Sequence, residues 1–189
     1  CPYCREPVAE SEEEGHKRLM ERVKKNNPAA MNHMGKTRYD AGDYDTAFEY
    51  WTKAAELGEA EAHFSLSVMY LNGEGVEKDW KKSIYHLEKA AVGGHPYARH
   101  NLGCIEVANG SFERAKKHFI IAANHGYHDS LERLRQLYAD GHASKEEYEG
   151  ALRAYQAAVD AAKSAEREVA EEALRIICCS SSRAQGAPP

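Results

Sequence analysis

EAHFSLSVMYLNGEGVEKDWKKSIYHLEKAAVGG, residues 61–94, is the stretch that decides the fold. Apolar residues at helical spacing flank the segment NGEGVEKD, which predicts a helix, a glycine-rich loop and a second helix. In the loop, Gly73 and Gly75 permit tight turns. Val76 can tuck beneath the loop, and Asp79 can cap the helix that follows. The stretch therefore predicts one helical hairpin.

Shifted copies of this hairpin lie on both sides of it. The segments AAELGEAEA (54–62), AAVGGHPYA (90–98) and AANHGYHDS (122–130) each carry an Ala-Ala pair and then a glycine at the same distance. Asn26 takes the place that Gly58 has in the next copy. We expect each of these residues to end a helix in a left-handed turn, with the next helix starting within two residues. Such short connections predict antiparallel packing.

Small and large residues recur at matching positions of the copies. Gly35, Ser67 and Gly103 stand in the first helices, where a larger side chain would keep a neighbouring helix away. The second helices carry a small residue and, one turn later, a residue that is large in the first three copies: Ala47 and Trp51, Ser83 and Leu87, Ala115 and Phe119, Gly150 and Ala154. Rows of this kind allow two helices to approach closely and interlock.

The remaining signals set the boundaries of the array. Residues 10–26 run from acidic to basic, which suits the helix dipole, and predict an N-terminal capping helix. The repeat array is expected over residues 27–163, with Asn27 capping its first helix and Ser144 and Glu147 forming a capping box before its last. A helical extension is expected over 164–177. Residues 178–189 lack any period and are predicted to be disordered.

The segment LSVMYLNGEGVEKDWKKSIYHLEKAAVGG, residues 66–94, resembles a Sel-1-like repeat. The flanking copies have a shorter loop and lean towards the related tetratricopeptide pattern. The resemblance covers about residues 27–163 and implies an all-α fold, a right-handed α-solenoid of about four antiparallel helical hairpins. It also implies a protein–protein interaction scaffold or adaptor whose partner is a protein or peptide segment.

The first seven residues, CPYCREP, resemble the last ligand pair of a RING-type zinc finger. Cys1 and Cys4 would be half of a zinc site, which needs two more ligands, and none follows at a plausible distance. The resemblance implies that residues 1–9 are the remnant of a finger with its other ligands upstream. The array would then recruit a substrate for a RING-type ubiquitin ligase, and the finger would contact a ubiquitin-conjugating enzyme. The alternative is a plain repeat adaptor in which CPYC is incidental.

Composition and motifs argue against other classes of function. The chain has 30 acidic and 25 basic residues and a formal charge of −5, which is too mild and mixed for a nucleic-acid binder. No apolar run is long enough for a membrane span. Five irregularly spaced cysteines argue against a secreted disulfide framework and favour an intracellular, cytoplasmic location. The array shows no catalytic residue set and needs no cofactor; Cys104 as a nucleophile would lack a His–Asp arrangement, and His86 is expected to be structural.

In tetratricopeptide arrays the first helices line a concave surface that holds peptide partners. With Gly35, Ser67 and Gly103 taken as equivalent positions, the resemblance implies three rows of partner-binding residues: Asn32, Lys36 and Tyr39; Phe64, Val68 and Leu71; and His100, Cys104 and Val107. The rows change from polar to apolar, which suits an extended or helical segment with one charged end. The alternative is that several of them, Leu71 and Val107 especially, belong to the core.

Overall fold

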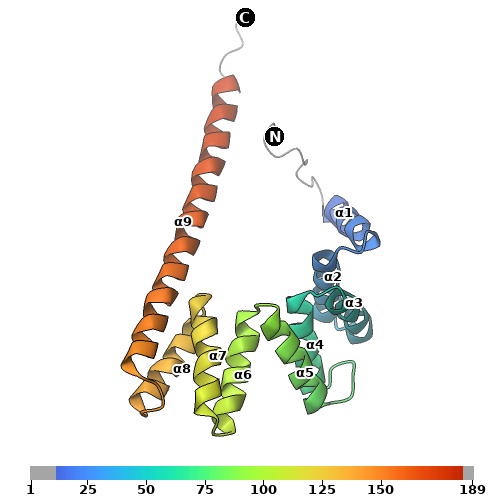
Figure 1. The fold of residues 1–189 in the computed structure, drawn as a ribbon. Helices are drawn as coiled ribbons and strands as arrows, with labels where there is room; N and C mark the ends of the chain where they lie inside the picture. The colour runs from blue at the N-terminus through green and yellow to red at the C-terminus, as the bar shows by residue number, and fades with distance from the viewer. Residues whose placement is uncertain (1–11, 185–189) are drawn as a thin grey trace, which may run out of the picture. The chain divides into compact units, whose positions relative to one another are not determined.

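The computed structural model describes residues 12–184, and the secondary structure in this part of the chain is a series of nine α-helices (Figure 1). Their bounds are α1 Glu12–Lys24, α2 Pro28–Asp40, α3 Tyr44–Glu56, α4 Ala60–Asn72, α5 Trp80–Val92, α6 Pro96–Ala108, α7 Phe112–Asn124, α8 His128–Ala139 and α9 Lys145–Ala184. The predicted fold class, an all-helical repeat array, is confirmed.

The helices form two compact units, Cys1–Leu102 and Gly103–Pro189, with the boundary inside α6. In the first unit α2 packs against α3, α4 packs against α5, and α3 also packs against α4, while α1 covers α2. In the second unit α7 packs against α8, and α9 packs against both. Within each unit, these helices contact their neighbours in the chain, as expected of a repeat array.

Left-handed turns end the helices at the predicted places. Asn26 has a φ of 55°, and Gly58, Gly94 and Gly126 have φ values of 86°, 89° and 80°. Asparagine and glycine tolerate this conformation better than other residues do. The equivalence of Asn26 with the three glycines, inferred from sequence spacing alone, is confirmed.

The predicted helix caps are also present. Asn27 Oδ1 accepts a hydrogen bond of 2.9 Å from the backbone N–H of Ala30, and the side chain of Asp79 accepts one of 3.0 Å from Lys82. Figure 1 shows the loop before Asp79 between the paired helices α4 and α5. Val76 in this loop is partly buried against the core of the first unit, as predicted.

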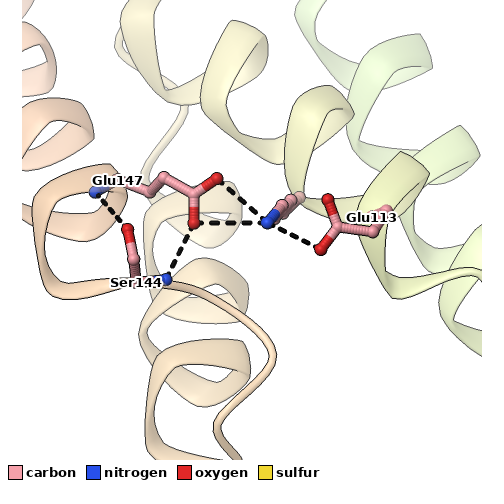
Figure 2. A network of polar contacts seen from close by, with 4 residues as sticks. Glu113, Ser144 and Glu147 are labelled. Atoms are coloured by element: carbon pink, nitrogen blue, oxygen red, sulfur yellow. Dashed lines mark hydrogen bonds and ion pairs between the residues drawn. The ribbon is translucent and has the colours of Figure 1, made fainter.

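The capping box of α9 is part of a larger polar network (Figure 2). The backbone N–H of Ser144 donates to Glu147 Oε2 at 2.7 Å, and the N–H of Glu147 donates to Ser144 Oγ at 3.2 Å. Lys116 Nζ of α7 lies 3.0 Å from Glu147 Oε1 and 2.8 Å from Glu113 Oε1. The hydrogen bonds that Lys116 donates to Glu113 and Glu147 raise the pKa of Lys116. The hydrogen bond that Glu147 accepts from the Ser144 backbone, with that from Lys116, lowers the pKa of Glu147. The network fixes the start of α9 against α7.

Close approach of helices occurs where the small residues were predicted. A Cβ atom on Gly35 would lie 2.5 Å from Trp51 Cδ1, and one on Gly103 would lie 2.6 Å from Phe119 Cε1. In the middle hairpin, Ser83 Oγ donates to the backbone oxygen of Ser67 at 2.8 Å. The core of the first unit includes Met31, Ala47, Trp51, Ala54, Ala55, Ala62, Leu66 and Met69, and that of the second unit includes Ala115, Phe119, Ala123, Leu131, Leu134, Leu137, Ala143 and Ala151.

The C-terminal helix is longer than predicted. α9 runs without interruption from Lys145 to Ala184, so the extension expected over 164–177 is part of one helix. The predicted disorder is wrong for residues 178–184, because no glycine or proline stands between 151 and 185 to end the helix. Residues 185–189 and the segment 1–9 lie outside the described part. None of the described helices, α9 included, combines the length and apolarity needed to cross a membrane.

Candidate functional site: two grooves between first helices

A cavity of about 190 Å³ opens between α2 and α4 in the first unit, and we call it the α2–α4 groove. Its lining residues are Asn32, Lys36, Tyr39 and Asp40 of α2, Trp51 of α3, and Glu61, Phe64, Ser65 and Val68 of α4. Residues spaced by three or four positions share one face of a helix, so each helix contributes a continuous stripe. The structure thus brings together five of the nine residues that the sequence predicted: Asn32, Lys36, Tyr39, Phe64 and Val68.

Aromatic rings form one wall of the α2–α4 groove. The ring of Tyr39 lies 5.4 Å from that of Trp51 and 5.2 Å from that of Tyr44. Trp51 is only 4% exposed, and its Nε1–H donates to the backbone oxygen of Asn32 at 3.2 Å. This contact fixes the indole beneath the groove.

The hydroxyl of Tyr39 is held by a carboxylate. It donates to Glu74 Oε2 at 2.6 Å, and Glu74 lies in the loop between α4 and α5. This hydrogen bond, together with burial, raises the pKa of Tyr39 to about 12. The phenol therefore stays protonated at neutral pH, and its hydroxyl is engaged by Glu74 while the ring lines the groove.

His95 orients the opposite wall. Its ring stacks on Phe64 with centroids 4.4 Å apart and an interplanar angle of 16°. His95 Nδ1 accepts a hydrogen bond of 3.2 Å from the backbone N–H of Ala98, so the ring proton is assigned to Nε2, which donates to Glu61 Oε2 at 2.9 Å. His95 is 7% exposed. One buried imidazole thus positions both Phe64 and Glu61.

The polar groups of the groove are mostly acceptors. Lys36 Nζ lies 3.7 Å from Asp40 Oδ2 in an exposed ion pair, which contributes little stability on its own. Asn32 Oδ1 is buried and has no hydrogen-bond partner. A buried acceptor without a donor is unfavourable.

A second cavity of about 320 Å³ lies between α6 and α8 in the second unit, and we call it the α6–α8 groove. It is lined by Cys104, Val107, Ala108, Phe112, Phe119, Arg133, Gln136, Leu137, Asp140 and His142. Cys104 and Val107 were predicted from the repeat register. Burial raises the pKa of the Cys104 thiol, and its interaction with Arg133 opposes this shift. A protonated, partly buried thiol is a poor nucleophile.

Two predicted residues are not among those lining either groove. Leu71 is 48% exposed, so it belongs neither to the groove nor to the core that was its alternative. His100 is likewise absent from both linings. Sequence reasoning missed Asp40 and Glu61, although Asp40 stands four residues after Lys36 and Glu61 three before Phe64, spacings that place them on the same helical faces.

Two histidines make a close contact outside the groove. His63 Nδ1 of α4 lies 3.0 Å from His86 Nδ1 of α5, and His86 stacks on Tyr70 with centroids 5.6 Å apart. Burial lowers the pKa of His86 to about 4 and also lowers that of His63. With both rings neutral, the Nδ1–H of one ring donates to the Nδ1 of the other, and this contact joins α4 to α5. Nowhere in the described residues do three or more His, Cys, Asp or Glu side chains gather in an arrangement that could hold a metal ion, and Cys1 and Cys4 lie outside these residues.

Paired helices of equal spacing, with a groove between successive first helices, define a helical-repeat protein. The Sel1 repeat family matches residues 28–59, 60–95 and 96–127, together more than half of the 189 residues, and the chain belongs to this family. The matched segments coincide with the hairpins α2–α3, α4–α5 and α6–α7.

Curated relatives share the repeats over part of their length. The chain is 33% identical over 89 residues to chitin synthase regulatory factor 4 of Schizosaccharomyces pombe, covering 47% of this chain and 14% of the relative. It is 36% identical over 70 residues to cytochrome c oxidase assembly factor 7A of Xenopus laevis, covering 36% and 30%. It is 33% identical over 55 residues to DAP3-binding cell death enhancer 1 of Rattus norvegicus, covering 29% and 11%. The matched stretches thus span less than a third of each of these relatives.

Solved structures show the same fold. A Sel1 repeat protein from Oxalobacter formigenes superposes with a TM-score of 0.64 at 27% identity, covering 79% of this chain and 65% of that one. A protective antigen of uropathogenic Escherichia coli that displays an SLR fold superposes with a TM-score of 0.60 at 22% identity, covering 81% and 34%. At that identity the second likeness concerns the fold alone.

Proposed function

We propose that this chain is a protein-binding scaffold whose α2–α4 groove holds a segment of a partner protein. The observation that carries the proposal is the ordered wall of the groove, in which Trp51, Tyr39 and Phe64 are each fixed by a contact behind them. A preformed wall lowers the entropy that binding must cost. Aromatic side chains in a desolvated pocket are also the usual centres of binding energy.

Membership of the Sel1 repeat family supports the same function. The relatives are named as a regulatory factor, an assembly factor and a DAP3-binding protein, and these names fit proteins that act on other proteins. A groove of about 190 Å³ has room for one or two side chains, so the partner segment would insert an anchor there and run along α2 and α4.

The test is a selection of displayed random peptides on the intact chain, followed by affinity measurements on the peptides that bind. Phe64→Ala should weaken selected peptides by about ten-fold or more, because it removes an anchor of the groove. Val68→Ala should weaken them as well and leaves the Phe64–His95 stack in place. Val92→Ala is the matched control, since Val92 is 79% exposed and lies outside the groove. Peptides whose affinity is the same for all variants would refute the groove as the binding site.

The finer hypothesis of a RING-type ubiquitin ligase is supported by the string CPYCREP alone. None of the comparisons supports a zinc finger, so the plain adaptor is the function that we propose. The ligase hypothesis requires further Cys and His ligands at cross-brace spacing upstream of Cys1. A zinc measurement on a chain extended in that direction would decide it, since a RING-type finger would retain zinc through gel filtration and an incidental CPYC would not.

A further inference from the structure

We propose that the α2–α4 groove selects an arginine side chain of the partner segment. This inference rests on the proposed function and names the chemistry that the groove recognises. Lys36 is the one cation among the groove's lining residues, and Asp40 lies beside it, which leaves the Glu61 carboxylate in excess. The lining therefore carries a net negative charge.

Hydrogen-bonding capacity points the same way. Asp40 and Glu61 present carboxylate oxygens from the two facing helices, α2 and α4. The indole N–H of Trp51 is already used by the backbone of Asn32, and the hydroxyl of Tyr39 by Glu74. Lys36, the one charged donor of the lining, already faces Asp40, so an occupant that supplies charged donors suits the remaining carboxylate.

The aromatic wall favours a cation as the source of those donors. The side chains of Tyr39, Trp51 and Phe64 line the groove, and aromatic rings attract cations to their faces through the ring quadrupole. Guanidinium is planar, stacks on such rings and carries five donors, so it can reach acceptors on α2 and α4 together. An ammonium is a single, strongly hydrated point charge and fits acceptors spread over two helices less well.

The test uses N-acetyl-arginine methylamide as the probe, titrated into the intact chain labelled with ¹⁵N. The chain has two tryptophans, Trp51 in the groove and Trp80, which is 56% exposed and outside it. We expect a saturable shift of the Trp51 indole signal with a Kd of about 1–10 mM, the range for a single anchoring side chain, and no shift of the Trp80 signal.

Two analogues separate charge from shape. N-acetyl-citrulline methylamide has nearly the same shape without the charge, and we expect it to bind at least about ten-fold more weakly. N-acetyl-lysine methylamide keeps the charge without the planar fork and should also bind more weakly. Equal binding of the citrulline compound, or equal or tighter binding of the lysine compound, would overturn the arginine assignment.

Charge-removing variants locate the site. Asp40→Asn and Glu61→Gln should each weaken the arginine probe by about three- to ten-fold, because each removes one carboxylate from the groove. Glu61→Gln keeps an oxygen that can accept the hydrogen bond from His95 Nε2. Glu56→Gln is the matched control, because it removes the same charge from an exposed position outside the groove. Wild-type affinity in both groove variants would refute the inference.

The two proposals fail in different ways. Arginine selection would be refuted, and the scaffold function would remain, if the selected peptides depend on Phe64 but the arginine probe does not shift the Trp51 signal. A Trp51 signal that responds to arginine, with selected peptides that are indifferent to Phe64, would support the pocket chemistry and refute the peptide groove.

Discussion

Gly35→Ala should improve the helix propensity of α2 but worsen its packing against α3, and the structure predicts that the packing loss is the larger effect. In an exposed helix interior this substitution stabilises by about 0.5–1 kcal/mol. Here the new Cβ would lie 2.5 Å from both Cδ1 and Nε1 of Trp51. The indole is 4% exposed and bonded to the backbone of Asn32, so it has little room to move away. Overpacking of a well-packed core costs about 1–3 kcal/mol. We expect a net loss of about 1–2 kcal/mol in the free energy of unfolding.

Urea unfolding followed by Trp51 fluorescence in a Trp80→Phe background measures this change in the first unit. Gly150→Ala, followed by circular dichroism, is the matched control, because a Cβ on Gly150 in α9 would meet nothing within 4 Å. That control should gain about 0.5–1 kcal/mol from propensity alone. A Gly35→Ala protein as stable as the parent, alongside a stabilised control, would show that α2 and α3 do not approach as closely as described.

Two further predictions concern the stability of the first unit. Trp51→Ala should lower the free energy of unfolding by about 3–5 kcal/mol, measured by urea denaturation, and an unchanged midpoint would contradict its place in the core. The His63–His86 pair predicts a pH dependence: burial lowers the pKa of His86 to about 4 and also lowers that of His63, so the unfolded chain, with histidine near its ordinary 6.5, binds protons first as pH falls. The contribution of the pair to the free energy of unfolding is therefore complete above about pH 6.5 and is lost as the pH falls towards 4. At pH 5 the loss should be about 1–2 kcal/mol once partial solvent screening is allowed for. His86→Phe should make the free energy of unfolding depend less on pH in this range.

Features set by short-range chemistry could be predicted from the sequence. Asn26, Asp79 and the pair Ser144 and Glu147 act on backbone groups within a few residues, so their spacing along the chain is enough to assign a turn or a cap. The hairpins could be predicted for the same reason, because the same turn recurs between them at nearly the same interval. The predicted end of α9 failed because serines and cysteines were interpreted as a tail, although nothing in 178–184 stops a helix that is already formed.

Contacts between residues far apart in the chain could not be predicted in the same way. The pairing of His63 with His86 depends on the rotation of α5 against α4, and Lys116 reaches Glu147 across 31 positions. The tie between His95 and Glu61 is of the same kind. Repeat register places backbones next to one another, but side-chain partners at these distances depend on rotamers that a sequence does not show.

The copies share the residues that pack the hairpins and differ at the positions that line the two grooves. Gly35 and Gly103 hold the same place in the register and both meet an aromatic ring, because the packing of a hairpin allows few alternatives there. Groove positions are free of that constraint. Lys36 in the α2–α4 groove corresponds to Cys104 in the α6–α8 groove, and Asp40, four residues after Lys36, corresponds to Ala108. Aromatic rings line both grooves, but the α2–α4 groove has Lys36 beside the two carboxylates Asp40 and Glu61, while the α6–α8 groove has a thiol, Arg133 and one carboxylate. Two grooves built on one backbone pattern with different chemistry would recognise different parts of a partner, which predicts that charge changes in the α2–α4 groove alter selectivity without altering the fold.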